Sequence, residues 1–334
     1  MSIEKRLQEK AVELLSEKKV DVVVGYEAGT LPYQAAPCFI ENPDDEGRLV
    51  LNPFCSVNLA KYVHDILMAH KASQKRMKPE QRTKKVVGVV ARGCTTRSLV
   101  IHLQERQYER DQIFIIGVPC RGYVSKKKLA AAAGGKEITA CAIINDRLSF
   151  TTPDGTKEIP LESVLAESCL SCRYNNPVIS DVMVGDPAPP MKPDSEYADV
   201  DAFEAMSGEE RWNYFAEEMK KCIRCYACRN TCPSCYCKVC FVEQSQPRWV
   251  GVSVDESDTQ AFQIMRLFHM AGRCVDCGSC VDVCPMGVDL RKFLKKLDKD
   301  GYNLFAHRAG EKMEQQPPLS VHSMDDKDEF IYEP

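Results

Sequence analysis

The spacing of apolar residues predicts alternating helices and strands at the N-terminal end of the chain. An amphipathic helix is expected from one stripe, formed by Ile3, Leu7, Ala11, Leu14 and Leu15. Charged residues interrupt this stretch, so it lacks the apolar core of a signal peptide. Buried strands are expected at three β-branched runs, Val20–Val24, Val86–Val90 and Ile113–Ile116, and a helical pattern from Thr96 to Tyr108 lies between the last two. Alternation of this kind predicts an α/β fold.

A hairpin and a linker are predicted at the end of this first domain. The apolar run Ala140–Ile144 precedes a hairpin-like segment, Asp146–Ile159, whose turn is marked by Pro153-Asp154-Gly155. We expect the α/β domain to cover residues 1–186. Four prolines between positions 187 and 193 then predict a semi-rigid linker over residues 187–199.

The second half of the chain has helical periodicity, and we expect a mainly α-helical domain over residues 200–308. An acidic segment around Val200–Lys221 favours helix, and Asp258 is a plausible N-cap for a later one. The apolar stripe of that later helix would be Phe262, Met265, and Phe268 or His269. A similar pattern recurs at Leu290, Phe293, Leu294 and Leu297. Residues 309–334 form an acidic tail without periodicity, which we interpret as an extended arm; disorder and docking to a partner are equally open.

Composition and charge exclude several classes of function. The chain has 334 residues and a formal net charge of -4, which gives no support for binding nucleic acid. Its longest apolar runs, such as Val86–Ala91, fall far short of the roughly 18 residues that indicate a membrane span. We therefore expect a cytoplasmic protein. Its 18 cysteines are clustered, and in a reducing compartment clustered cysteines usually hold metal.

Two cysteine motifs carry the strongest signal. Each matches the C-x2-C-x2-C-x3-C-P run of two-cluster ferredoxins, in which the fourth cysteine binds the other cluster. The pattern therefore predicts two 4Fe-4S clusters with crossed ligands. One set is Cys222, Cys225, Cys228 and Cys284, and the other is Cys274, Cys277, Cys280 and Cys232. Structural zinc is the alternative, although zinc sites favour two separated pairs of cysteines.

The 41 residues between Cys232 and Cys274 contain a predicted helix and are too many for a minimal bacterial ferredoxin. This domain resembles the helical ferredoxin domains of succinate dehydrogenase iron–sulfur subunits and heterodisulfide reductase small subunits. The resemblance implies a conductor of electrons between protein partners. No Cys-Cys-Gly motif is present, which argues against the disulfide-reducing subunit of heterodisulfide reductase.

Three further cysteines, Cys235, Cys237 and Cys240, follow the first motif. With a fourth ligand from elsewhere, such as Cys38 or Cys55, they would bind a further cluster. The alternative is that they are apolar thiols packed around the two clusters, since free cysteine is among the most buried residue types.

The α/β domain places cysteines where its predicted strands end. Cys94 follows the strand at Val86–Val90, and Cys120 follows the strand at Ile113–Ile116. Open α/β sheets bind ligands at that edge. Further along lie Cys169-x2-Cys172 and the turn Gly185-Asp186.

In this order the motifs resemble the beta-subunit family of coenzyme F420 (deazaflavin) hydrogenases and formate dehydrogenases, over roughly residues 85–190. The resemblance implies a flavin and a third 4Fe-4S cluster in this domain, the latter bound by Cys94, Cys120, Cys169 and Cys172. The family's Gly-Thr-Pro-Cys turn is here Ala91-Arg92-Gly93-Cys94, and the dicluster module is appended at the carboxyl end.

Candidate flavin-binding residues lie near these turns. Arg92, Arg97, Arg121 and the run Lys126-Lys127-Lys128 are candidates by charge for a diphosphate. Gly122, Gly185 and Asp186 are candidates from the turns themselves. The chain has no G-x-G-x-x-G and no P-loop motif, and its six histidines lack metal-ligand spacing.

These features predict an electron-transfer subunit of an anaerobic oxidoreductase, with 4Fe-4S clusters and FAD and with no catalytic residue of its own identified. The expected partners are the other subunits of a hydrogenase, formate dehydrogenase, methylenetetrahydrofolate reductase or heterodisulfide-reductase-like complex, and ferredoxin is a further candidate. The alternatives are a flavin-free iron–sulfur wire and a freestanding ferredoxin-dependent oxidoreductase.

Overall fold

A five-stranded sheet organises the N-terminal half of the chain. The computed structural model describes residues 2–190 and 196–321. Strand order in the sheet is β2-β1-β3-β4-β8, with β2 antiparallel to β1 at one edge and the other strands parallel. The strands are β1 (Val22–Ala28), β2 (Ala35–Ile40), β3 (Val87–Ala91), β4 (Ile113–Gly117) and β8 (Val182–Met183).

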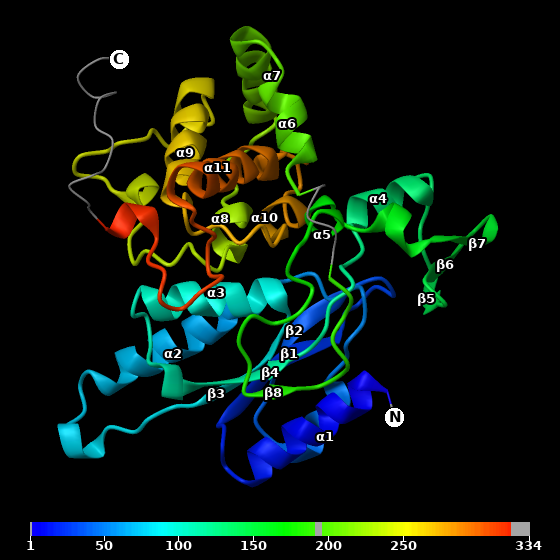
Figure 1. Cartoon of the computed structure of the whole chain (residues 1–334), viewed down its shortest axis with the longest axis vertical. Helices are drawn as coiled ribbons and strands as arrows, with labels where there is room; N and C mark the ends of the chain where they lie inside the picture. The colour runs from blue at the N-terminus through cyan, green and yellow to red at the C-terminus, as the bar shows by residue number, and fades with distance from the viewer. Residues whose placement is uncertain (1, 191–195, 322–334) are drawn as a thin grey trace.

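Helices cover both faces of this sheet, which explains its apolar strands. All five residues of β3 are buried. Helix α1 (Ile3–Ser16) packs on one face, and α2 (Ala60–Gln74) and α3 (Gly93–Gln104) pack on the other (Figure 1). The α/β class and the three predicted strands are confirmed. The sequence analysis missed β2, which contains a proline and is only partly buried, and β8, which has two residues.

Helix α3 differs from its prediction over Thr96–Tyr108. It begins three residues earlier, at Gly93, directly after β3. It ends at Gln104, because Arg106 adopts a left-handed backbone with φ 52°. Tyr108 lies beyond the helix, and its buried ring contacts His102 edge to face. A loop residue that packs back on the helix therefore extended the apparent helical pattern.

A small antiparallel sheet extends from the side of the first domain (Figure 1). Its strands are β5 (Ala140–Ile144), β6 (Arg147–Thr152) and β7 (Gly155–Pro160). The predicted hairpin is confirmed, and Gly155 takes a φ of 118° at its turn. Leu148 and Phe150 of β6 pack against Leu129 of α4 (Lys126–Ala132).

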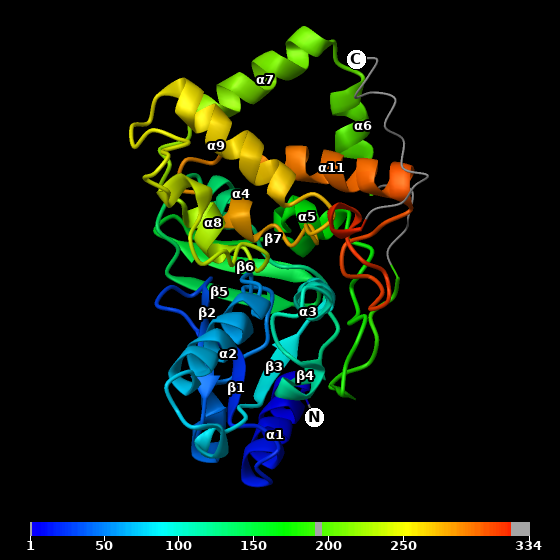
Figure 2. The ribbon, with the colours of Figure 1, turned by 90° about the vertical axis from the view of Figure 1, so that its left-hand side faces the viewer.

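The second half of the chain is helical and lies over α3 (Figures 1 and 2). Its helices are α6 (Ala198–Glu204), α7 (Gly208–Lys220), α8 (Ala227–Thr231), α9 (Glu256–His269), α10 (Ser279–Asp282) and α11 (Leu290–Phe305). The acidic segment predicted as helical is two helices, because Ser207 caps a new one through a capping box with Glu210. Leu290 and Leu294 of α11 are buried, as their spacing predicted.

The predicted linker and the predicted tail are only partly described by the structure. Residues 191–195 of the predicted linker and residues 322–334 of the predicted tail lie outside the described residues. Residues 309–321 return to α3, where Gln104 Nε2 donates to the carbonyl of Lys312 at 2.8 Å.

Helix α9 buries a different face from the predicted one. Its N-cap is Asp255, so Asp258 lies within the first turn. Phe262 is buried as expected, but Met265 and Phe268 are 45% and 58% exposed. Helix α9 instead buries three polar side chains, Thr259, Gln263 and Arg266. Apolar periodicity therefore placed the helix correctly but misjudged its orientation.

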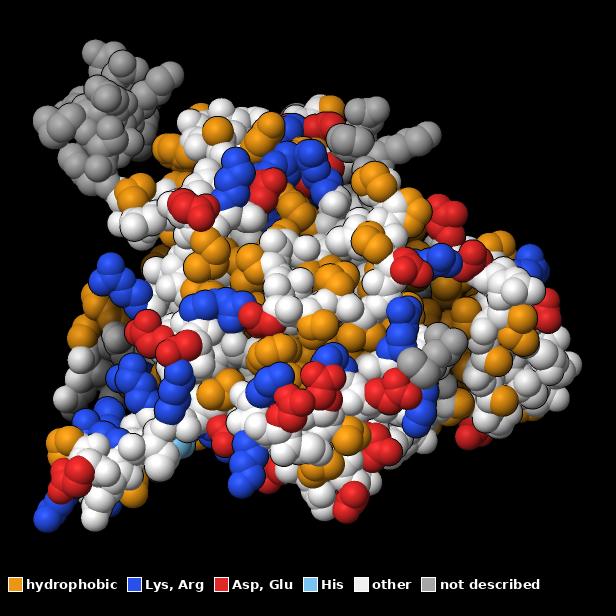
Figure 3. Space-filling view, turned by 60° about the horizontal axis from the view of Figure 1, so that its bottom comes forward, with side chains coloured by type: hydrophobic (Ala, Val, Ile, Leu, Met, Phe, Trp, Pro, Cys, Tyr) orange, Lys and Arg blue, Asp and Glu red, His pale blue; other side chains and the backbone are white. Residues whose placement is uncertain are grey.

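On the face shown in Figure 3, acidic and basic side chains are interspersed with apolar ones. Within residues 2–190 and 196–321, no helix is both long enough and apolar enough to cross a membrane.

Candidate metal centres

The structure brings together the four cysteines predicted for the first set. Cys222, Cys225, Cys228 and Cys284 line one cavity. The loop of the first motif turns tightly because Arg224 and Tyr226 adopt left-handed backbones, with φ values of 50° and 59°. This path points successive thiols at one space before α8 begins at Ala227.

The second set lines a second cavity, formed by Cys232, Cys274, Cys277 and Cys280. Its loop repeats the backbone of the first, with φ values of 55° at Asp276 and 75° at Gly278. The short helices α8 and α10 follow the two loops and pack against each other. Each motif therefore contributes three thiols to its own cavity and its last thiol to the other.

The second loop is pressed against the N-terminal domain at Gly278. A Cβ atom at this position would lie 2.3 Å from Ser168 Oγ and 2.5 Å from Tyr123 Oη. Since the φ of Gly278 is also positive, only glycine satisfies both the turn and the contact.

A third cavity of about 330 Å³ opens at the carboxyl edge of the parallel strands. Cys94 reaches it from the first turn of α3, and Cys120 reaches it from the loop after β4. Cys169 on α5 (Glu167–Leu170) and the nearby Cys172 complete the four thiols. Cys277 lines both this cavity and the second one, so the two share a wall.

The donor chemistry of these cavities fits iron–sulfur clusters. Burial raises the pKa of Cys94 and of Cys280 to about 12, so thiolates there need a compensating positive charge, which bound iron supplies. Backbone N–H groups donate to sulfur at 3.3 Å on Cys120 and Cys172, and at 3.4 Å on Cys284. Hydrogen bonds of this kind tune iron–sulfur centres in proteins. Among the described residues, no three Cys, His, Asp or Glu side chains converge closely enough to hold a single metal ion.

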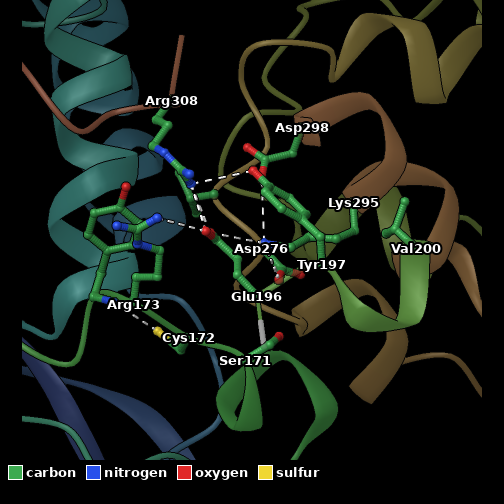
Figure 4. A network of polar contacts seen from close by, with 12 residues as sticks. Ser171, Cys172, Arg173, Glu196, Tyr197, Val200, Asp276, Lys295, Asp298 and Arg308 are labelled. Carbon is green, nitrogen blue, oxygen red and sulfur yellow. Dashed lines mark hydrogen bonds and ion pairs between the residues drawn. The ribbon is translucent and has the colours of Figure 1, made fainter. Parts of the chain in front are cut away.

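A buried polar network connects the N-terminal domain near the third cavity with the loop of the second cysteine motif (Figure 4). Glu196 is 5% exposed and accepts from Arg308 at 2.9 and 3.0 Å and from Arg173 at 3.1 Å. Lys295 lies 3.4 Å from Asp276, within the second loop. Burial alone would raise the pKa of Asp276, but Arg291 and Lys295 lower it overall. The network thus keeps a carboxylate beside Cys277 charged and paired.

The flavin candidates are divided between the third cavity and other places. Arg92, Arg121 and Gly122 line the cavity. Arg92 also donates to Tyr26 Oη at 2.9 Å, and Arg121 pairs with Asp146 at 3.2 Å.

Three other candidates, Arg97, Gly185 and Asp186, do not line the third cavity. Arg97 donates to the carbonyls of Ala309 at 2.9 Å and Val275 at 3.1 Å. Gly185 and Asp186 follow β8, where Gly185 packs on Pro119.

The lysine run of α4 faces the second cysteine motif. Lys126 lies 3.5 Å from Asp282 of α10, and Lys127 donates to the carbonyl of Val281 at 3.3 Å. Lys128 pairs with Glu167 of α5 at 2.6 Å. Within the described structure Lys126 and Lys127 therefore connect the two domains, whereas Lys128 binds within the N-terminal domain.

The three surplus cysteines line a cavity of about 960 Å³ between α2 and the helical domain. Cys240 caps a short 3-10 helix by accepting from the backbone of Glu243. Cys38 and Cys55, considered above as fourth ligands, are buried in the core around the five-stranded sheet instead.

Comparisons with known proteins match two successive regions of the chain. Residues 84–213 match the family model for the carboxyl-terminal part of the coenzyme F420 hydrogenase/dehydrogenase beta subunit, and residues 218–288 match the 4Fe-4S dicluster domain. The F420-dependent formate dehydrogenase subunit beta of Methanocaldococcus jannaschii is 36% identical over 98 residues, 28% of this chain. That match spans 24% of the relative's length.

A second relative matches over most of its length. The F420-dependent formate dehydrogenase 1 subunit beta of Methanococcus maripaludis is 23% identical over 92% of this chain and 90% of that protein. A solved chain of the F420-reducing [NiFe] hydrogenase complex from Methanosarcina barkeri, studied with xenon, is 19% identical with a TM-score of 0.32. That match covers 52% of this chain and 62% of the solved chain. The chain thus carries a domain similar to the carboxyl-terminal part of the coenzyme F420 hydrogenase/dehydrogenase beta subunit over residues 84–213, followed by a 4Fe-4S dicluster domain over residues 218–288.

Proposed function

We propose that this protein is an electron-transfer subunit that holds three 4Fe-4S clusters. The observation that carries the proposal is the grouping of twelve cysteines into three sets of four, each set around its own cavity, with Cys277 of the second set also lining the third cavity. The ligands of the first cluster would be Cys222, Cys225, Cys228 and Cys284. Those of the second would be Cys232, Cys274, Cys277 and Cys280. Those of the third would be Cys94, Cys120, Cys169 and Cys172.

The proposed clusters form a continuous series. Cys277 lines both the third and the second cavity, and the crossed ligands Cys232 and Cys284 tie the second cavity to the first. Electrons would therefore pass along the third, second and first sites in turn, in either direction. The clusters supply one-electron carriage, and the protein supplies their fixed spacing.

We propose in addition that FAD binds beside the third cavity, at the carboxyl ends of the parallel strands. Arg121 and Gly122, in the loop after β4, line the third cavity, and so does Arg92. Bound there, a flavin would exchange two electrons with a donor and single electrons with the clusters. Gly185 and Asp186 stay candidates for the family's Gly-Asp turn. A wire without flavin is the alternative.

The names of both relatives favour a subunit of a larger complex. Both are beta subunits of F420-dependent formate dehydrogenases. By this analogy the chain would reside in the cytoplasm and pass electrons between a reduced deazaflavin and a catalytic partner subunit. Partners of hydrogenase, methylenetetrahydrofolate reductase or heterodisulfide-reductase-like type fit the same role. The alternative is a freestanding enzyme that accepts electrons from soluble ferredoxin.

Metal and flavin analysis of anaerobically purified protein tests the proposal. Three clusters require about twelve irons and twelve sulfides per chain. A content of about eight irons per chain would show that the third cluster is absent. Zinc without sulfide would show that the protein holds none of the three clusters. Acid extraction should release FAD, and its absence after reconstitution would favour the wire.

Gentle purification of the native protein tests the assembly. We expect it to elute with partner subunits. A monomer near 37.6 kDa that reduces its flavin with reduced ferredoxin would instead support the freestanding enzyme.

A further inference from the structure

Arg266 is buried between the two proposed clusters of the helical domain. It lies on α9, which connects the two cysteine motifs, and it is 3% exposed. Its Nη2 donates to the carbonyl of Cys228, a residue of the first cavity, at 3.1 Å. The same side chain lines the second cavity beside Cys232 and Cys280.

Two of the three guanidinium nitrogens of Arg266 lack partners. Within the described residues, Nε and Nη1 are buried and make no hydrogen bond. A buried N–H group without an acceptor is costly, and a buried cation without an anion is more so. The arrangement therefore suits an anionic group that occupies the adjoining cavity and accepts from these atoms.

The charge of Arg266 persists in its buried position. An arginine guanidinium stays protonated at neutral pH even when it is buried. Arg273 lines the same second cavity, but both ends of its guanidinium bind Glu105, at 2.6 and 2.7 Å. Of these two arginines, Arg266 is the one whose charge no carboxylate balances in the described structure.

We propose that Arg266 is a positioning residue for electron transfer, whose uncompensated cation raises the reduction potentials of both clusters in the helical domain. Reduction makes a cluster and its thiolates more negative, so a nearby cation stabilises the reduced state more than the oxidised state. Its free N–H groups strengthen this effect if they donate to cluster sulfur. The inference rests on the proposed 4Fe-4S clusters and adds a control on their potentials.

A redox titration of the reconstituted full-length protein, followed by EPR, tests this role. Arg266→Gln removes the charge and should shift the midpoint potentials of both helical-domain clusters to more negative values, leaving the third cluster less affected. Arg266→Lys keeps the charge and should give potentials between those of Arg266→Gln and the wild type. The matched control is Arg248→Gln, which removes an exposed arginine of the same domain and should leave all potentials unchanged.

Equal potentials in Arg266→Gln, Arg248→Gln and the wild type would overturn the proposal. If Arg266→Gln does not load its clusters, the wild-type protein labelled with ¹⁵N-arginine decides the question. Pulsed EPR of its reduced clusters should then detect a guanidinium nitrogen that Arg266→Lys lacks, and an unchanged coupling would refute the role. Failure of the proposed function would be seen separately, because the wild-type protein itself would then lack iron and sulfide.

Discussion

His102 connects the two halves of the molecule through a single imidazole. Its Nε2 donates to the carbonyl of Pro233, directly after Cys232, at 2.7 Å. Its Nδ1 accepts from the hydroxyl of Tyr108 at 3.0 Å. Burial lowers the pKa of His102 to about 3 from its ordinary 6.5, so the ring is neutral in the folded protein.

This depressed pKa predicts a loss of stability in mild acid. Between pH 6.5 and 3 the unfolded chain protonates His102 and the folded chain does not, so stability falls as pH drops below about 6.5. The expected loss is about 1.4 kcal/mol at pH 5.5. Thermal midpoints of the wild type and His102→Gln at pH 7.5 and 5.5 measure it. The wild type should lose more than the variant, whereas His70→Gln should behave as the wild type; equal losses in all three would contradict the assignment.

The crossed ligand sets make a second prediction at the residue scale. Cys232→Ser should abolish the second cluster, although Cys232 belongs to the first motif, and should lower the iron content by about four per chain. EPR spectra of the reduced protein should therefore match those of Cys277→Ser. A match with Cys225→Ser would show that each motif binds its own cluster. Cys235→Ser, which removes a neighbouring thiol outside both sets, should keep its full iron content.

At the scale of elements, two glycines differ in why the fold could need them. One is required by a turn and a close contact, and the other affects only helix propensity. Gly278 precedes α10 in a left-handed turn against Ser168 and Tyr123. Gly301 lies within α11, where a Cβ atom would meet no other atom within 4 Å.

Gly278→Ala should lower the thermal midpoint and the content of the second cluster, because the new methyl group displaces the loop. Gly301→Ala should raise stability by about 0.5–1 kcal/mol with unchanged iron content, because alanine favours the helix. Differential scanning calorimetry and iron analysis of both variants measure these effects. A Gly278→Ala protein as stable and as iron-rich as the wild type would show that the contact can relax.

The same scale shows what the sequence could predict. Apolar runs located β3 and β4, and the Pro-Asp-Gly turn located the hairpin. Cysteine spacing anticipated which thiols of the helical domain would share a cavity, and the family resemblance implied the third set. The sequence pattern could not reveal that α9 buries Arg266 and exposes Phe268. The surface that packs against α9 is formed by loops, and the path of these loops depends on the two cysteine motifs. Nor could the sequence pattern separate Arg97 from Arg92, since only tertiary packing decides which arginine lines the third cavity.

At the scale of the whole molecule, Arg97 fastens the helical domain to the sheet domain. Its guanidinium donates to Ala309 and Val275 and stacks on the ring of Tyr174, 3.9 Å from the centroid. A Cβ atom at Gly310 would lie 2.1 Å from the carbonyl of Arg97, so the chain after Ala309 is also held closely.

Arg97→Lys should loosen this junction, because lysine cannot make two directed bonds and stack at once. We expect a loss of about 2–3 kcal/mol, seen as a lower thermal midpoint, with the flavin content unchanged. Arg106→Lys, at an exposed position beyond the same helix, provides the control. Specific loss of flavin at normal stability would instead support the prediction that Arg97 binds the diphosphate.

The exchange of last cysteines between the two motifs also constrains how the protein is made. As the chain leaves the ribosome, the first motif emerges with three of the thiols of its cavity, and the fourth, Cys284, follows more than fifty residues later. The second proposed cluster lacks its full ligand set until Cys280 emerges, and the first lacks it until Cys284 emerges. Both proposed clusters therefore depend on the second motif, so a chain that ends before Cys280 can complete neither of them.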